Sequence, residues 1–395
     1  MRRIVLHVGP GKCGSSSVQA AILRPAAALH DHLAGVLLQP AELLGLDREQ
    51  PEAAVEDRFH RLIARAQADH PGKVLVLSHE MIFKMVPVLR NLARIARAHA
   101  DEVVVVAYVR RQSDFLVSAF GQWLFRAPAR IAETAAVLRD HGLDPALFWG
   151  VERHLIAVLL GGWEVGRQLS GHLYFDWSSS VSERAEALAA LGVPLSVGLL
   201  PRPGFERPLI ADFLARIGLP VEFAAAVEQV RNPGFPPALI EGVCAAIEAG
   251  YAMPGPGEHA DFFDAMGTVH ADGAGPNQTF LAGLKDRVDT AFAPANATFA
   301  RQFSLPVSYF APRRQVTQAQ AQDEIWREGR VRAALPEALR QRERAARADL
   351  ALMAWAAYRG GGHGPVGKER LAAFPGLGLD CATTNGSGIC AVPEI

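Results

Sequence analysis

RIVLHVGPGKCGSSSV, residues 3–18, joins a short apolar run to a glycine-rich loop and then to a run of serines. The run Arg3–Val8 is rich in β-branched residues and stops at Gly9, which is typical of a buried parallel strand. From Ser15 the pattern SSSVQAAIL is helical, with hydroxyl side chains at its start. The stretch therefore predicts a strand, a loop and a helix in that order.

Two later apolar runs, Lys73–Leu77 (KVLVL) and Glu102–Val109 (EVVVVAYV), are also predicted strands. Apolar residues recur with helical spacing in three other segments, Pro51–Asp69, Val86–Ala98 and Pro208–Gly218. Strands that alternate with helices favour an α/β fold, and here we expect a P-loop-type parallel sheet flanked by helices. The aromatic run His172–Trp177 (HLYFDW) is predicted as a fourth strand.

A change of composition near Arg313 divides the chain. We predict an α/β domain over residues 1–313, a C-terminal helical appendage over 314–358 and a Gly-rich tail over 359–395. Residues 250–280 are rich in Gly, Pro, Asp and His and are expected to form a long loop or a lid.

Length and charge exclude several classes of protein. The 395 residues are 50% apolar, enough for a sizeable core, and their net charge of -1 gives no general attraction to nucleic acid or anionic lipid. Four cysteines are too few and too scattered for a disulfide framework. No apolar run approaches the ~20 residues of a membrane span, and the first residues lack a secretory signal. We expect a cytoplasmic protein.

The glycine-rich loop is a candidate anion site. Backbone N–H groups at a helix N-terminus attract an anion, glycines let the backbone curl around it, and Ser15, Ser16 and Ser17 add hydroxyl donors. An ordinary strand–helix turn would need only one serine as N-cap. A Walker A loop, GxxxxGK[ST], has its lysine where Ser15 stands, whereas Lys12 lies inside the loop. No predicted strand ends in an aspartate for magnesium, so a P-loop nucleotide kinase is the weaker alternative.

Two motifs carry a family resemblance. LHVGPGKCGSSSVQ resembles the 5′-phosphosulfate loop of sulfotransferases that use 3′-phosphoadenosine 5′-phosphosulfate (PAPS), whose bacterial form is close to LHIGxxKTGTTSLQ. YVRRQSDFLVSAFGQWL resembles the 3′-phosphate motif of the same family, with Arg110 at a strand end and Ser118 eight residues later. The resemblance covers residues 3–22 and 103–125, and Cys13 departs from the usual threonine or serine.

The resemblance implies a PAPS-dependent sulfotransferase that needs no metal. Lys12 would stabilise the charge that builds on the leaving phosphate. The residues implied in nucleotide binding are Gly11, Lys12, Cys13, Gly14, Ser15, Ser16, Ser17, Arg110 and Ser118. The acceptor would be a hydroxyl, or less readily an amine, of a carbohydrate, lipid or small molecule. A catalytically silent protein that binds adenosine bisphosphate is a further alternative, and the oligomeric state stays open.

An acceptor hydroxyl needs a base, and the predicted strand Lys73–Leu77 ends in Ser78-His79-Glu80. Family members carry a histidine or a glutamate after this strand, and a Ser-x-Glu pattern is common in the bacterial branch. We favour Glu80 as the base and keep His79 as the second candidate. The alternative for Glu80 is a carboxylate that only stabilises the start of a helix.

Overall fold

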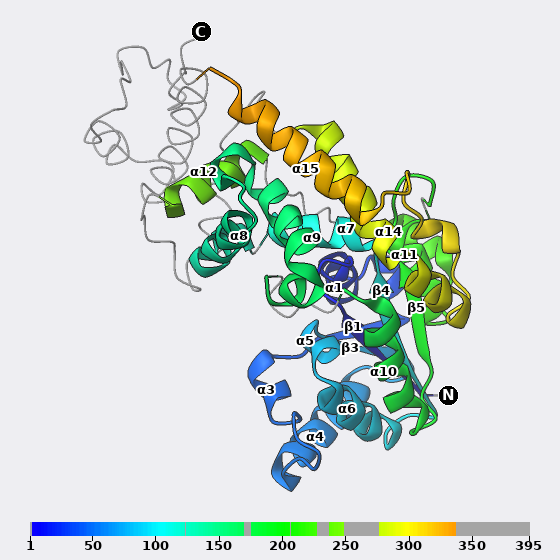
Figure 1. Ribbon diagram of the computed structural model, residues 1–395. Helices are drawn as coiled ribbons and strands as arrows, with labels where there is room; N and C mark the ends of the chain where they lie inside the picture. The colour runs from blue at the N-terminus through cyan, green and yellow to red at the C-terminus, as the bar shows by residue number, and fades with distance from the viewer. Residues whose placement is uncertain are drawn as a thin grey trace, which may run out of the picture. The chain divides into compact units, whose positions relative to one another are not determined.

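In the described part of the chain, five parallel strands form one sheet in the computed structural model (Figure 1). The structure describes residues 2–122, 124–169, 175–205, 207–226, 237–248 and 276–336. The strand order is β2-β3-β1-β4-β5, and the strands are β1 (Arg3–Gly9), β2 (Leu33–Leu37), β3 (Val74–Ser78), β4 (Glu102–Val109) and β5 (Leu195–Leu199). The predicted α/β class with a helix-flanked parallel sheet is confirmed.

The pairing of the strands places their carboxyl ends at one edge of the sheet. In the centre, His7 of β1 pairs with Ser78 of β3, and Gly9 pairs with Ala107 of β4. Every residue of β1 and β4 after the first is buried, because helices cover both faces. The segments that follow β1, β3 and β4 therefore leave the sheet side by side.

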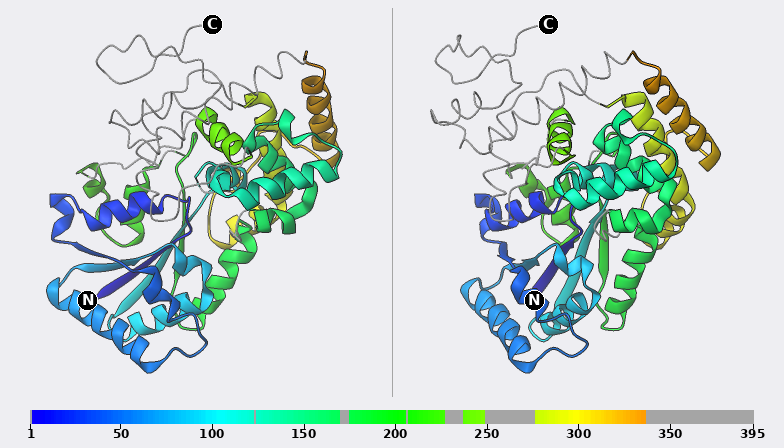
Figure 2. Two further views of the ribbon diagram at one scale, coloured as in Figure 1. Left: turned by 90° about the vertical axis from the view of Figure 1, so that its left-hand side faces the viewer. Right: turned by 60° about the vertical axis from the view of Figure 1, so that its left-hand side comes forward.

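Helices pack on both faces of this sheet (Figure 2). On one face α1 (Ser15–Leu23) contacts α11 (Leu209–Arg216), and on the other face α6 (Val86–Arg97) contacts α4 (Ala53–Asp69) and α10 (Trp177–Ala189). Helix α6 buries Val88, Leu92 and Ile95, whose spacing defines one apolar stripe. The shorter elements here are α2 (Ala27–His30), α3 (Pro40–Leu44), α5 (Met81–Lys84), η3 (Val221–Ala226) and η5 (Val307–Tyr309).

The chain divides into two compact units. The first unit holds the sheet and comprises the described residues of Met1–Leu116, Leu173–Pro233 and Asp286–Gln315. The second unit is helical, with η1 (Leu124–Arg126), α8 (Pro128–Asp140), η2 (Pro145–Leu147), α9 (Gly150–Leu169), α12 (Pro237–Glu248) and α15 (Gln318–Ala333). Helices α7 (Gln112–Phe120) and α14 (Gln278–Gln302) each contribute residues to both units. The predicted boundaries at 313 and 358 stay predictions.

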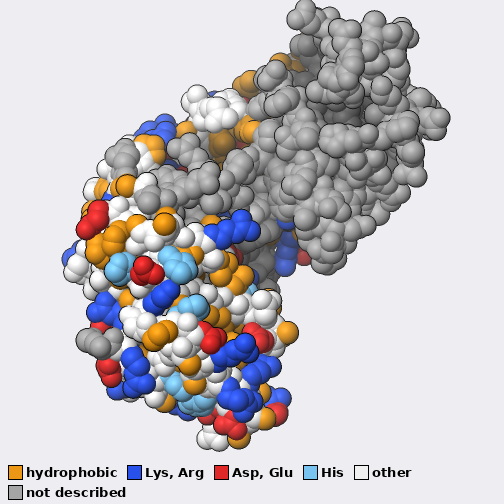
Figure 3. Space-filling view, turned by 180° about the vertical axis from the view of Figure 1, so that it is seen from behind, with side chains coloured by type: hydrophobic (Ala, Val, Ile, Leu, Met, Phe, Trp, Pro, Cys, Tyr) orange, Lys and Arg blue, Asp and Glu red, His pale blue; other side chains and the backbone are white. Residues whose placement is uncertain are grey.

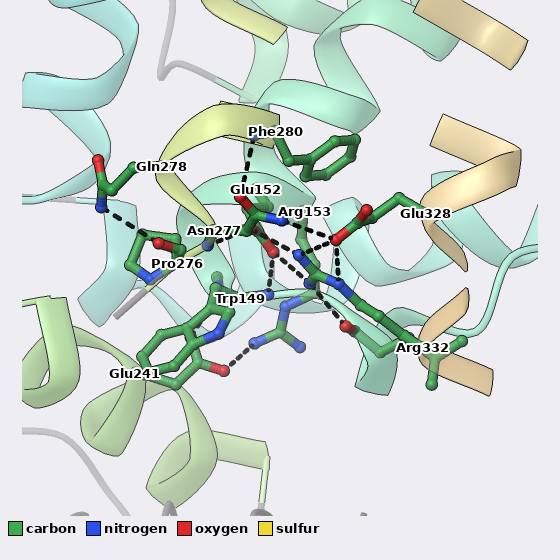
Figure 4. A network of polar contacts seen from close by, with 12 residues as sticks. Trp149, Glu152, Arg153, Glu241, Pro276, Asn277, Gln278, Phe280, Glu328 and Arg332 are labelled. Carbon is green, nitrogen blue, oxygen red and sulfur yellow. Dashed lines mark hydrogen bonds and ion pairs between the residues drawn. The ribbon is translucent and has the colours of Figure 1, made fainter. Parts of the chain in front are cut away.

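Buried Glu152 joins α15 to the rest of the second unit (Figure 4). Its carboxylate accepts four hydrogen bonds, from two nitrogens of Arg332 at 2.6 and 3.0 Å and from the backbone N–H groups of Trp149 and Asn277 at 2.9 and 3.2 Å. The Arg332 guanidinium also lies over the rings of Phe148 and Phe280, 5.3 and 5.4 Å from their centroids. The helix of the predicted C-terminal segment is therefore fixed by a buried ion pair.

Some predicted elements differ from the structure. The strands predicted at Lys73–Leu77 and Glu102–Val109 are confirmed as β3 and β4, but β2 and β5 were not predicted. The strand predicted at His172–Trp177 is wrong for 175–177, because the Asp176 carboxylate accepts from Ser178 N–H at 3.1 Å and starts α10. Residues 172–174 lie outside the described residues, as do most of the predicted loop at 250–280 and all of 337–395.

Charges of both signs are interspersed over the described part of the surface that Figure 3 shows. Among the residues that the structure describes, none of the helices combines the length and the apolar character that crossing a bilayer requires.

Candidate functional site

The loop between β1 and α1 has an unusual backbone. Gly9 and Gly14 adopt φ angles of 89° and 87°, in the left-handed region that glycine occupies without steric cost. Lys12 lies between them with φ 66°, although a lysine side chain disfavours this conformation. Residues held in such conformations cluster at functional sites. The loop that the sequence indicated as an anion site therefore also contains a strained backbone conformation.

The N-terminus of α1 offers donors to an anion. Its N-cap is Gly14, which has no side chain to accept from the first N–H groups of the helix. The Gly14 carbonyl accepts from the N–H groups of Ser17 and Val18, each at 3.1 Å. The N–H groups of Ser15 and Ser16 donate to no backbone carbonyl of the described residues. Ser15 is buried, Ser16 is exposed and Ser17 is half-buried.

Glu80 lies against this loop. It follows β3 by two residues, and its Oε1 accepts a hydrogen bond of 2.5 Å from the Ser15 hydroxyl. A Cβ atom at Gly9 would lie 3.3 Å from the Glu80 Cα, which is a tight contact, so glycine at this position favours the close approach of the two segments. The predicted base and the predicted anion loop therefore lie together.

His79 is oriented differently. It is half-buried, and its Nδ1 accepts the backbone N–H of Met81 at 3.0 Å. A nitrogen that accepts from a backbone N–H carries no proton, so neutral His79 bears its proton on Nε2. Burial lowers the pKa of His79 more than the neighbouring Glu80 raises it. In this arrangement Nε2 is a donor, which favours Glu80 over His79 as the base.

Arg110 lies on the other side of the loop. It directly follows β4, and its Nη1 donates to the Lys12 carbonyl at 3.0 Å. The Arg110 carbonyl accepts from Trp177 Nε1 at 2.6 Å, which fixes the backbone at this point. Its Nε is buried and has no hydrogen-bond partner among the residues that the structure describes. A buried donor of this kind on a permanent cation suits the binding of an anion.

Arg111 has a structural role instead. Its side chain is 4% exposed, and Nε lies 3.1 Å from Oδ2 of both Asp114 and Asp289. Asp289, on α14, also accepts from the Ser113 N–H at 3.1 Å and from the Ser113 hydroxyl at 2.8 Å. Burial raises the pKa of Asp289 to about 7, although Arg111 and Ser113 oppose this.

The residue between these two anchors is fixed to the same helix. Gln112 and Asn296 exchange two buried hydrogen bonds of 2.8 and 2.9 Å. Three consecutive residues after Arg110 are therefore held by α14, more than 170 positions later in the chain. No pattern in the sequence signals these contacts.

Arg202 is a second candidate anion ligand, which the sequence reasoning missed. It comes three residues after β5, whose carboxyl end lies beside that of β4. Its Nε is buried without a partner, and its guanidinium lies 5.0 Å from the ring centroid of Tyr309. The Tyr309 hydroxyl donates to the Leu200 carbonyl at 2.8 Å. Burial lowers the pKa of Arg202, and nearby Arg111 lowers it further. The sequence feature that could have indicated Arg202 is an arginine shortly after the end of a strand, as at Arg110.

The remaining predicted residues are placed as follows. Cys13 is 1% exposed, and burial raises the pKa of its thiol to about 12. Only its backbone can therefore serve a ligand. Gly11 is buried in the loop, and Ser118 is half-buried on α7. Ser118 and Arg110 belong to different compact units, so their joint binding of one phosphate stays a prediction.

The described residues contain no group of three or more His, Cys, Asp or Glu side chains arranged to hold a metal ion. Neither a scan against protein-family models nor searches of curated proteins and of solved structures found a match to this chain. The family resemblance therefore rests on the two motifs.

Proposed function

We propose that this protein is a sulfotransferase that moves a sulfuryl group from PAPS to an acceptor hydroxyl, or less readily to an amine. The observation that carries the proposal is the meeting of three segments at one sheet edge. Neighbouring strands β3, β1 and β4 are followed by Glu80, by the Lys12 loop and by Arg110. Ligands of open α/β sheets bind at this edge.

Donor groups around the loop suit a nucleotide with two phosphate positions. The N–H groups at the start of α1 can hold one phosphate, as helix N-termini do. Arg110 and Arg202 follow the neighbouring strands β4 and β5. Their Nε atoms, which have no hydrogen-bond partner among the described residues, can hold the second phosphate. This division supports a donor with phosphates at both its 5′ and 3′ positions.

The side chains then have distinct tasks. PAPS supplies the sulfuryl group, and no other group is transferred. Glu80 accepts the proton of the acceptor hydroxyl as the new oxygen–sulfur bond forms. The bond between sulfur and the bridging oxygen breaks, and its electron pair remains on the phosphate. Lys12 stabilises the negative charge that develops there, which is electrostatic stabilisation of a transition state.

Thermal unfolding with nucleotides tests the donor site. Adenosine 3′,5′-bisphosphate should raise the Tm, adenosine 5′-monophosphate should raise it less, and ATP with magnesium should leave it unchanged. A larger shift with ATP and magnesium would contradict the proposal and favour a P-loop kinase.

Transfer of ³⁵S from labelled PAPS to pools of carbohydrates, lipids and small metabolites tests the reaction itself. Glu80→Gln is the matched control, since it keeps the size of the side chain and removes its basicity. Binding of the bisphosphate without transfer to any pool would favour the catalytically silent binding protein.

A further inference from the structure

The hydroxyl of Ser15 is committed to Glu80. Ser15 is the first residue of α1 and is 2% exposed, and its Oγ lies 2.5 Å from Glu80 Oε1. That distance is typical of a hydroxyl that donates to a carboxylate. A serine hydroxyl has one proton, so Ser15 cannot at the same time donate to a phosphate.

One other hydrogen bond joins the same two elements. One turn after Ser15, Gln19 Nε2 donates to the Ser78 hydroxyl at 3.3 Å. The same hydroxyl lies 2.8 Å from His7 Nδ1, inside the core of the sheet. The contact between α1 and the end of β3 therefore does not depend on the bond from Ser15 to Glu80. That bond can break while both backbones stay in place.

An incoming phosphate creates a conflict at this point. A phosphate held by the first N–H groups of α1 lies next to the Ser15 hydroxyl and is a strong acceptor of its proton. The Glu80 carboxylate has the same sign of charge as the phosphate, so the two repel each other. Rotation about one side-chain torsion lets Ser15 change its acceptor.

We propose that the 5′-phosphate of the donor and Glu80 compete for the proton of Ser15, so that donor binding releases Glu80 for the acceptor. This inference rests on the proposed function and adds an order of events to it. In the free protein Glu80 is held by the loop. Once the donor is bound, Ser15 donates to the phosphate, and Glu80 Oε1 is available for the acceptor hydroxyl.

A double-mutant cycle on nucleotide affinity tests this competition. The four proteins are the wild type, Ser15→Ala, Glu80→Ala and the double variant, and the Kd of adenosine 3′,5′-bisphosphate is measured by calorimetry. In the wild type, Glu80→Ala removes a like charge and also frees the Ser15 hydroxyl. In the Ser15→Ala protein it removes the charge alone. We expect Glu80→Ala to tighten binding at least about tenfold more with Ser15 present.

Ser16 provides the matched control, because it is the adjacent serine of the same turn and is exposed. Glu80→Ala should change affinity equally with and without Ser16→Ala. Circular dichroism checks that each protein is folded, and Ser15→Gly replaces Ser15→Ala if the latter is not.

Equal effects of Glu80→Ala in the Ser15 and Ala backgrounds would overturn the competition and leave the proposed function standing. The competition would also be overturned if Ser16→Ala changed the effect of Glu80→Ala on affinity as much as Ser15→Ala does. The coupling would then not be specific to the hydrogen bond between Ser15 and Glu80. Failure of all the proteins to bind the bisphosphate would overturn the proposed function, and this inference with it.

Discussion

Two adjacent arginines should respond in opposite ways to truncation. Arg110 makes one side-chain hydrogen bond, to the Lys12 carbonyl at 3.0 Å, and has a buried Nε without a partner. Arg111 is 4% exposed and pairs with Asp289, which is fully buried. We therefore expect Arg110→Ala to impair nucleotide binding and Arg111→Ala to impair folding.

The magnitudes follow from these contacts. Arg110→Ala loses one hydrogen bond and an unsatisfied donor, so the free energy of unfolding should change by no more than about 1 kcal/mol. Binding of a 3′-phosphorylated nucleotide should weaken by about 2–4 kcal/mol, or roughly 30- to 1,000-fold. Arg111→Ala leaves the Asp289 carboxylate without its buried counter-ion, which costs about 3–5 kcal/mol of stability.

The loss of stability caused by Arg111→Ala should depend on pH. Burial raises the pKa of Asp289 to about 7, and Arg111 holds it below a still higher value. A carboxyl group with a raised pKa stabilises the folded state at low pH, and this stability is lost as the pH rises through the folded pKa. Without Arg111 the loss continues to higher pH. The deficit of Arg111→Ala should therefore be small at pH 6 and approach its full size at pH 9.

Urea unfolding at pH 6 and pH 9 measures the stability of both variants. Calorimetry compares adenosine 3′,5′-bisphosphate with adenosine 5′-monophosphate, which lacks the 3′-phosphate and should bind Arg110→Ala almost as well as the wild type. Equal losses for the two nucleotides would refute the assignment of Arg110 to the 3′-phosphate. A loss of stability in Arg110→Ala as large as that in Arg111→Ala would refute the division of roles.

Three other pairs of substitutions test the site and the C-terminal helix. Lys12→Ala and Lys12→Gly should both lower turnover of PAPS by several orders of magnitude. In urea unfolding Lys12→Gly should be about 1 kcal/mol more stable than Lys12→Ala, because glycine accepts the left-handed φ. Equal stability of the two variants would contradict the strain inferred at Lys12. Glu80→Gln should lower kcat by ~10²–10⁴ without weakening nucleotide binding, and His79→Gln should lower kcat much less. The reverse order would make the histidine the base. Arg332→Ala should lower the free energy of unfolding in urea by about 3–5 kcal/mol, because Glu152 is left buried and unpaired. Arg327 is exposed on the same helix, and Arg327→Ala should lower it by less than about 1 kcal/mol. Similar losses for the two variants would contradict the fixing of α15 by the buried ion pair.

Local sequence signals predicted the central strands and failed at the edges of the sheet. Strands β1, β3 and β4 are runs of β-branched and apolar residues because helices bury both of their faces. Strand β2 (LAGVL) and strand β5 (LSVGL) are short and contain glycine, and among the described strands each pairs with one neighbour only. They become strands through pairing with β3 and β4, which is a tertiary effect that local propensity does not contain.

The residues of the candidate site likewise divide into those that local sequence signals predict and those that depend on tertiary contacts. Lys12, Glu80 and Arg110 follow strands that the sequence predicted, so their position at one sheet edge could be anticipated. Arg202 follows a strand that was not predicted. The support from Asp289 could not be anticipated, because its partners Ser113 and Arg111 lie 176 and 178 positions away and share no motif with it.

The fixing of α7 by α14 has a consequence during synthesis of the chain. The glycine loop and Glu80 are made within the first 80 residues, but the anchors of Arg111, Gln112 and Ser113 lie 176 to 184 positions later. At 5–20 residues per second, a ribosome reaches them roughly 10 to 40 s after it has made α7. Until then the start of α7 lacks its partners on α14, although Trp177, which donates to the Arg110 carbonyl, has already been made. A growing or shortened chain that ends before α14 should therefore contain the loop without a complete nucleotide site.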